Sequence, residues 1–157
     1  MKALICVYSY HHKNTEKIAN TIVGILNAAV KSPQDLVPEE IAKYDLVGFG
    51  AGIDRGKHYK PLLQFSDSLP AIKGQKIFIF STVGITGEKK VLKDHRTLRD
   101  ILVTKGCVVV GEYGCKGFNT NNILKLFGGM NKRSPNANDF KAAEDFAHTL
   151  KVEHYEQ

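Results

Sequence analysis

Three short runs of this chain are apolar at every position, and they constrain its fold more than any other feature. They are Leu4-Ile5-Cys6-Val7, Ile77-Phe78-Ile79-Phe80 and Cys107-Val108-Val109-Val110. A strand with one face in solvent alternates apolar and polar residues, whereas a strand without alternation is buried on both faces. Such strands occur in parallel sheets that helices cover on both sides. The sequence therefore predicts an α/β fold.

Strand-like and helix-like segments alternate along the chain. The expected strands cover residues 3–8, 28–31, 46–51, 76–81 and 107–113, and the expected helices cover 14–26, 61–68, about 91–105 and 138–150. Apolar residues recur at helical spacing in the second set. Strict alternation is typical of a doubly wound sheet. We therefore expect one domain, residues 1–157, built as a three-layer αβα sandwich with a five-stranded parallel sheet.

Composition excludes several classes of protein. With 157 residues, of which 43% are hydrophobic, the chain can bury a core. No apolar stretch approaches the roughly 18 residues of a membrane-spanning helix. The apolar start runs into polar residues without a cleavage site, so we expect a cytoplasmic protein. Three cysteines, an odd number without a close pair, argue against a disulfide framework or a zinc site.

The formal net charge of +6 would suit acidic partners, anionic membranes or nucleic acid. The basic residues are dispersed, however, without a run of five or more. This pattern is typical of a solvated surface. We therefore expect no nucleic acid and no stable membrane insertion.

The loop after the first strand is the first candidate binding site. Ligands of open parallel sheets bind beyond the carboxyl ends of the strands. This loop runs directly into a helix start, where exposed amides and the helix dipole favour an anion. The residues expected to hold a phosphate are Ser9, Tyr10, His11, His12, Lys13, Asn14 and Thr15. Asn14 could also cap the helix, since capping uses the same amides.

The segment Tyr8-Ser9…Asn14-Thr15-Glu16-Lys17-Ile18-Ala19 resembles the FMN phosphate loop of flavodoxins, which ends in Asn-Thr-Glu and opens the first helix. His11, His12 and Lys13 depart from the small residues usual there. The resemblance covers Ala3 to Leu150. It implies the strand order 2-1-3-4-5, FMN as cofactor, and electron transfer through the bound flavin, with no catalytic acid or base from the protein.

Two later loops are similar to the loops with which flavodoxins contact the isoalloxazine ring. The resemblance assigns to the ring Ala51, Gly52, Ile53, Asp54, Arg55, Gly56 and His58, and then Ser81, Thr82, Val83 and Gly84. Gly50, Gly52 and Gly56 would let the backbone approach the ring and let a peptide flip. The chain has no Trp, so stacking is expected from His58, Tyr59 or Phe118, or from Ile53 or Val83.

The segment Gly114-Cys115-Lys116-Gly117-Phe118 resembles a turn found in a branch of flavodoxin-like proteins. It adds Cys115 and Phe118 to the expected cofactor contacts. Cys115 is expected to be a plain loop thiol, because no second cysteine lies nearby to pair with it. Cys6 and Cys107 lie in apolar runs and are expected to be buried.

Other functions stay open at this point. The loop from Gly50 to Tyr59 is also similar to bacterial protoporphyrinogen oxidases of the flavodoxin type, which implies an FMN-dependent oxidoreductase acting on a quinone or porphyrinogen. The absence of Trp and the presence of Lys13 in the phosphate loop favour a flavin-free binding module on the same fold. Ser9 and Ser81 lack the Gly-x-Ser-x-Gly elbow of hydrolases, and His11 and His12 lack partners for a metal.

The expected partners are redox proteins, and the chain is expected to be a monomer or a weak homodimer. The segment after the last strand holds an apolar cluster of Ile123, Leu124, Leu126 and Phe127. The cluster is interpreted as a short helix that covers the end of the sheet, with an interface as the alternative.

Overall fold

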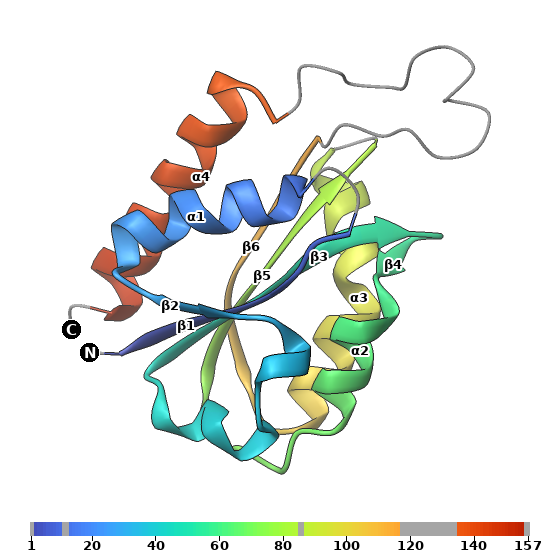
Figure 1. Cartoon of the computed structure of the whole chain (residues 1–157), viewed down its shortest axis with the longest axis vertical. Helices are drawn as coiled ribbons and strands as arrows, with labels where there is room; N and C mark the ends of the chain where they lie inside the picture. The colour runs from blue at the N-terminus through green and yellow to red at the C-terminus, as the bar shows by residue number, and fades with distance from the viewer. Residues whose placement is uncertain (1, 11–12, 85–86, 117–134, 156–157) are drawn as a thin grey trace.

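A computed structural model describes residues 2–10, 13–84, 87–116 and 135–155 (Figure 1). Five parallel strands form the sheet in the order β2-β1-β3-β5-β6. They are β1 (Ala3–Tyr8), β2 (Ala29–Lys31), β3 (Leu46–Asp54), β5 (Lys76–Val83) and β6 (Val108–Lys116). When the five parallel strands are numbered along the chain without β4, their order in the sheet is 2-1-3-4-5. This order confirms the predicted flavodoxin-like sheet. The short strand β4 (Lys57–His58) pairs antiparallel with the end of β3 and was not predicted.

Helices cover both faces of the sheet. In Figure 1, α1 (Asn14–Leu26) and α4 (Ala137–Leu150) lie on one face, and α2 (Lys60–Asp67) and α3 (Glu88–Thr104) lie on the other. Shorter helical segments are Pro33–Asp35, Pro38–Lys43 and Lys151–Tyr155. The predicted bounds of α1 match those of the structure. None of the described helices combines the length and apolar character needed to cross a membrane.

Two hydrophobic clusters, one on each face, explain why the central strands do not alternate. Leu4 and Cys6 pack with the side chains of α2 and α3, whereas Ile5 and Val7 pack with those of α1 and α4. Each of these four strand residues is therefore covered by a helix layer, and Leu4, Ile5 and Cys6 are fully buried. Burial of an aliphatic side chain contributes about 1.5–3 kcal/mol, so both layers are needed for stability.

Two glycines of β3 make room for phenylalanine rings of β5. Gly48 pairs with Phe78 and Gly50 pairs with Phe80. A Cβ atom at Gly50 would lie 2.1 Å from Cζ of Phe80. We predicted that Gly50 lets the backbone approach a flavin, and the structure corrects this interpretation, because a phenylalanine of the core fills that space.

The strand register brings the expected ligand loops to one edge of the sheet. Tyr8 pairs with Ala51, Ala51 with Ser81, and Ser81 with Gly114. These residues form one row across four strands. The loops that follow β1, β3 and β5 therefore leave the sheet side by side, as expected for a site at the carboxyl ends of parallel strands.

Candidate functional site

The loop after β1 presents the amino end of α1 to this edge. Lys13 is the N-cap residue and has a left-handed backbone, with φ of 52°, and its side chain makes no capping hydrogen bond. The amide of Glu16 donates to Oγ of Ser9 at 3.4 Å, which is a long contact. The prediction that Asn14 caps the helix is therefore wrong, because the cap lies one residue earlier. His11 and His12 lie outside the described residues.

Substituting Lys13 tests its two properties, the strained backbone and the positive charge. We expect Lys13→Gly to stabilise the fold by about 1 kcal/mol, because glycine adopts positive φ without strain. We also expect FMN to bind about fivefold more weakly, because the surface cation is lost. Urea unfolding and flavin fluorescence measure the two effects, with Lys17→Ala on the same helix as the control. Unchanged FMN affinity would separate Lys13 from the phosphate site.

The loop after β3 is a tight β-hairpin. Asp54 pairs with Lys57, and the two residues between them, Arg55 and Gly56, have φ of 49° and 78°. Positive φ at both central positions defines a type I′ turn, which favours glycine at the second position. Asp54, Arg55 and Gly56 are exposed, Gly52 and Ile53 are half-buried, and Ala51 is fully buried. The exposed turn and the half-buried strand end could thus face a ligand, whereas the Ala51 side chain could not.

The loop after β5 is tied to the loop after β1. Oγ1 of Thr82 lies 2.7 Å from Oγ1 of Thr15 in a buried hydrogen bond. Thr15 is the second residue of α1, so this bond fixes the expected phosphate loop against the expected ring loop. Val83 and Gly84 are half-buried at the edge, where a ligand could contact them. Ser81 is fully buried, which corrects its predicted contact with the ring.

Among the residues that the structure describes, tyrosines supply aromatic rings at the edge. The ring of Tyr59 packs edge-on against Tyr8 and Tyr10, with centroids 6.0 and 6.4 Å apart. Tyr10 is 65% exposed. His58, which we predicted to stack on a flavin, is 1% exposed and has no ring face available. We predicted only a role in the phosphate loop for Tyr10, although the i, i+2 spacing of Tyr8 and Tyr10 at a strand end could have suggested a second role as an aromatic contact.

Cys115 is a strand residue rather than the predicted loop thiol. β6 continues through Lys116, and Cys115 is 4% exposed within the hydrophobic cluster under α1 and α4. Burial raises the pKa of this thiol to about 12. Cys115 is thus a neutral core residue at physiological pH. Phe118, the other predicted contact of this segment, lies outside the described residues.

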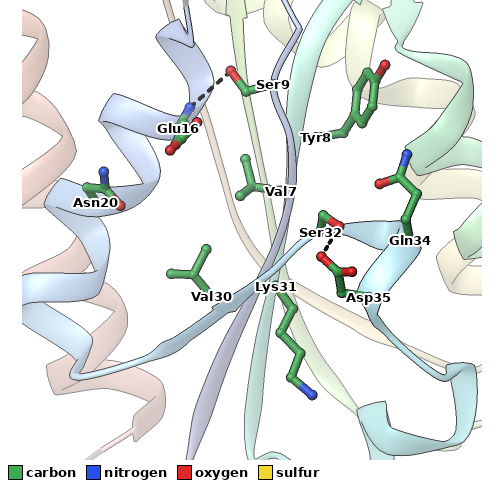
Figure 2. Close-up of a pocket in the computed structure, with 10 residues that line it drawn as sticks. All are labelled: Val7, Tyr8, Ser9, Glu16, Asn20, Val30, Lys31, Ser32, Gln34 and Asp35. Carbon is green, nitrogen blue, oxygen red and sulfur yellow. Dashed lines mark hydrogen bonds between the residues drawn. The ribbon is translucent and has the colours of Figure 1, made fainter.

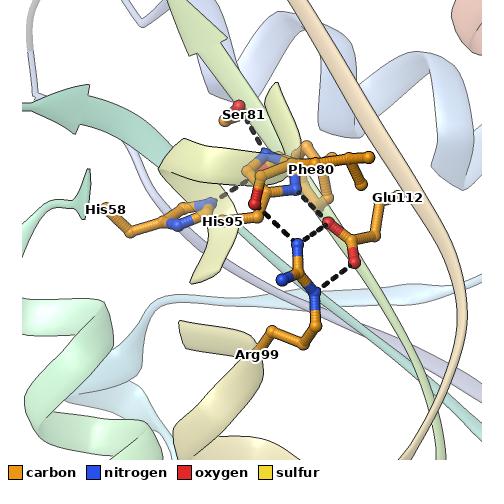
Figure 3. A network of polar contacts seen from close by, with 7 residues as sticks. His58, Phe80, Ser81, His95, Arg99 and Glu112 are labelled. Carbon is orange, nitrogen blue, oxygen red and sulfur yellow. Dashed lines mark hydrogen bonds and ion pairs between the residues drawn. The ribbon is translucent and has the colours of Figure 1, made fainter. Parts of the chain in front are cut away.

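A buried polar network behind the edge was missed by the sequence analysis (Figure 3). Nε2 of His95 lies 2.7 Å from Oγ of Ser81, and Nδ1 lies 2.9 Å from a carboxylate oxygen of Glu112. Arg99 donates to the same carboxylate at 2.6 and 3.0 Å. Nε2 of His58 lies 3.1 Å from the carbonyl oxygen of Phe80. A histidine on the apolar face of α3 and a glutamate within an apolar strand were the signals available.

The network has a definite charge pattern. Burial alone would raise the pKa of Glu112, but hydrogen bonds from His95 and Arg99 outweigh it and lower the pKa to about 2. Burial lowers the pKa of His58 to about 3, with a further contribution from His95. Glu112 is therefore a carboxylate and His58 is neutral at pH 7. The two imidazole rings lie 4.9 Å apart between centroids.

A pocket of about 460 Å³ lies on the other side of β1, toward β2 (Figure 2). Its walls combine the end of β1, the first turns of α1 and the segment after β2. Ser9 and Glu16 are shared with the loop after β1, and Ser32 donates to Asp35 at 2.7 Å opposite them. The pocket does not include the hairpin or the loop after β5, so it is separate from the expected ring site. Within the described part of the chain, no group of three or more metal-ligating side chains could hold a metal ion.

Comparison with known proteins identifies a matching protein family and many solved structures with a similar fold. A family model of the flavodoxin domain matches residues 5–153. An uncharacterized protein of Methanocaldococcus jannaschii is 48% identical over 150 residues, which cover 96% of this chain and 98% of that protein.

Two solved flavodoxins illustrate the structural similarity. Oxidised flavodoxin 2 of Bacillus cereus has a TM-score of 0.72 at 18% identity and covers 97% of this chain and 99% of its own. A Fusobacterium nucleatum flavodoxin bound to flavin mononucleotide has a TM-score of 0.67 at 18% identity, with 98% and 99% covered. At this level of identity, the similarity shows a common fold.

Proposed function

The chain belongs to the flavodoxin domain family, and from this premise we propose that it binds FMN and carries electrons between redox proteins in the cytoplasm. The observation that supports this most is the joining of two loops at the strand ends. The Thr15–Thr82 hydrogen bond fixes the amino end of α1 beside the loop after β5. A phosphate and an attached ring system need two such adjacent sites.

The donors around the amino end of α1 suit a phosphate group. The side chain of Lys13 makes no capping hydrogen bond, and the amide of Glu16 makes only a long one to Ser9, so the first-turn amides of α1 would be donors to an anion. Oγ of Ser9 lies beside these amides, and the exposed Lys13 ammonium, which lies 3.8 Å from a carboxylate oxygen of Glu16, would be a further partner for a phosphate. An anion gains from both the amides and the helix dipole. These residues would hold the phosphate of FMN.

The hairpin and the loop after β5 would hold the ring. Ile53 and the Arg55-Gly56 turn would form one wall, and Val83 and Gly84 would form the other. The Tyr59 ring and the exposed Tyr10 ring lie near the hairpin and could stack on a flavin face. Bound FMN would supply the redox chemistry, and the protein would supply binding and electrostatics. A carrier needs no proton-transfer group at the edge.

Phosphate recognition can be tested by comparing FMN with riboflavin, which lacks the phosphate. We expect FMN to bind at least about 100-fold more tightly, because the charge-assisted hydrogen bonds at α1 are lost with riboflavin. Quenching of flavin fluorescence during titration of the purified protein measures both dissociation constants. Equal affinities would contradict a phosphate site at α1, and binding of neither flavin would favour a flavin-free module.

We propose further that the redox partner has an acidic contact surface. Exposed cations surround the proposed site, and in the described part of the chain these five take part in no ion pair: Arg55, Lys57, Lys60, Lys89 and Lys116. Such charges accelerate association with an acidic protein, and salt screens them. All three cysteines are free and buried, which agrees with a reducing compartment.

The salt dependence of electron exchange tests this partner. With an acidic ferredoxin as the probe, we expect the rate to fall about tenfold between low and high salt. Reversing the charges of Arg55 and Lys57 should slow the exchange at low salt. The same reversal of Lys43 and Lys73, at the opposite edge, should leave it unchanged. A rate that does not depend on salt would contradict an acidic partner surface.

A further inference from the structure

The hairpin that forms one wall of the proposed ring site is short. β4 has only two residues, and they pair with Ile53 and Asp54 at the end of β3. The amide of Tyr59 adds a hydrogen bond to the carbonyl oxygen of Gly52 at 3.1 Å. A two-stranded hairpin on its own is only marginally stable in water. The position of this wall relative to β5 therefore depends on contacts that reach beyond the hairpin.

His58 of β4 reaches from the hairpin to β5. Its side chain is buried, and its Nε2 atom lies 3.1 Å from the carbonyl oxygen of Phe80. A carbonyl oxygen only accepts hydrogen bonds, so Nε2 carries the proton and donates it. The same ring packs against His95, with centroids 4.9 Å apart, and His95 is hydrogen-bonded to Ser81 of β5 at 2.7 Å. Figure 3 shows the His58 ring directed from the hairpin toward Phe80 and His95.

The second ring nitrogen of His58 is unfavourably placed. This atom, Nδ1, is buried and has no hydrogen-bond partner among the residues that the structure describes. A buried polar atom without a partner destabilises a fold. An apolar side chain of similar size would fill the same space without this cost. The environment therefore favours a role for the histidine other than stability.

We propose that His58 is a positioning residue that holds the hairpin against β5 and so sets the spacing between the two walls of the proposed ring site. The inference rests on the proposed function, since these walls are the segments proposed to contact FMN. One wall is the hairpin that carries His58. The other wall, formed by Val83 and Gly84, follows Phe80 along the chain. A wall held in place strengthens binding, because only the correctly arranged fraction of molecules is competent to bind.

Hydrogen exchange tests the positioning without any flavin. In His58→Leu we expect the Tyr59 amide to exchange at least about tenfold faster than in the wild type, because the hairpin opens more often. His58→Gln, whose side-chain amide can donate to the Phe80 carbonyl, should restore the protection. The amide of Val108, which donates to Gln75 at 2.8 Å at the opposite edge of the sheet, should exchange equally in all three proteins. Equal exchange of the Tyr59 amide in the wild type and His58→Leu would overturn the inference.

Flavin binding separates this role from a merely structural one. Quenching of FMN fluorescence gives the dissociation constant, and urea unfolding gives the stability. We expect FMN to bind about tenfold more weakly to His58→Leu although the stability of this variant is not lowered, and we expect His58→Gln to bind FMN as the wild type does. A loss of stability or folding in His58→Leu would overturn the inference, because the histidine would then serve the fold itself.

Two further outcomes distinguish this inference from the proposed function. Equal FMN affinity in the wild type and His58→Leu would overturn the positioning role alone. Failure of the wild-type protein to bind FMN would overturn the proposed function, and with it the role of His58 in setting a ring site, even where hydrogen exchange shows that His58 holds the hairpin.

Discussion

Replacing Gly50 by alanine is expected to destabilise the fold by about 3 kcal/mol or more. The added Cβ atom would lie 2.1 Å from Cζ and 2.3 Å from Cε2 of Phe80, whose ring is fully buried. Neither the ring nor the strand can move without disturbing close-packed neighbours. Urea unfolding followed by circular dichroism measures the loss.

Gly24 provides the matched control for this substitution. It lies exposed in α1, where a Cβ atom would meet nothing within 4 Å. Gly24→Ala should therefore stabilise the protein by about 0.5–1 kcal/mol. Adding Phe80→Leu to Gly50→Ala should recover part of the loss, because the two changes act on one contact. An unchanged unfolding midpoint in Gly50→Ala would contradict the packing described for β3 and β5.

Removing the negative charge of Glu112 should cost about 3 kcal/mol at pH 7, because the Arg99 guanidinium would lose its ion pair and keep only its hydrogen bond to the carbonyl of Leu92. We expect Glu112→Gln to show this loss in urea unfolding. Glu39→Gln, an exposed site, should change stability by less than about 0.5 kcal/mol. A loss of similar size in both variants would contradict the role of the network.

The same variant has a predicted pH dependence. Folding lowers the pKa of Glu112 from 4.5 to about 2. A lowered carboxyl pKa contributes stability that is complete above the ordinary pKa and is lost as pH falls toward the folded value. The difference between wild type and Glu112→Gln should therefore shrink between about pH 5 and pH 2. A difference that stays constant over this range would show that the carboxylate is not stabilised by its neighbours.

The fold followed from local patterns in the sequence. Runs without alternation predicted buried parallel strands, and the helical spacing of Ile18, Ile22 and Ile25 predicted α1. The hairpin was missed because Lys57–His58 is too short to show any periodicity. Gly56 indicated a turn, but no pattern in the neighbouring residues indicated that Lys57 and His58 pair with the end of β3.

The site was predictable only where it depends on local backbone. A strand followed by a helix start suggests an anion site without tertiary knowledge. The structure has this helix start after β1, and the anion site itself stays a prediction. Burial of His58 depends on coverage by α3, and burial of Cys115 depends on how far β6 extends. The Ser81–His95–Glu112 contacts join three elements across 14 and 17 positions of the chain. Such contacts cannot be deduced from the spacing of residues.

An absorption spectrum after reconstitution tests the central claim most directly. The purified protein is mixed with FMN, desalted, and measured before and after addition of dithionite. We predict flavin bands that stay with the protein after desalting and bleach on reduction, in proportion to one FMN per chain. Complete loss of flavin on desalting, with the protein still folded by circular dichroism, would contradict the proposed function.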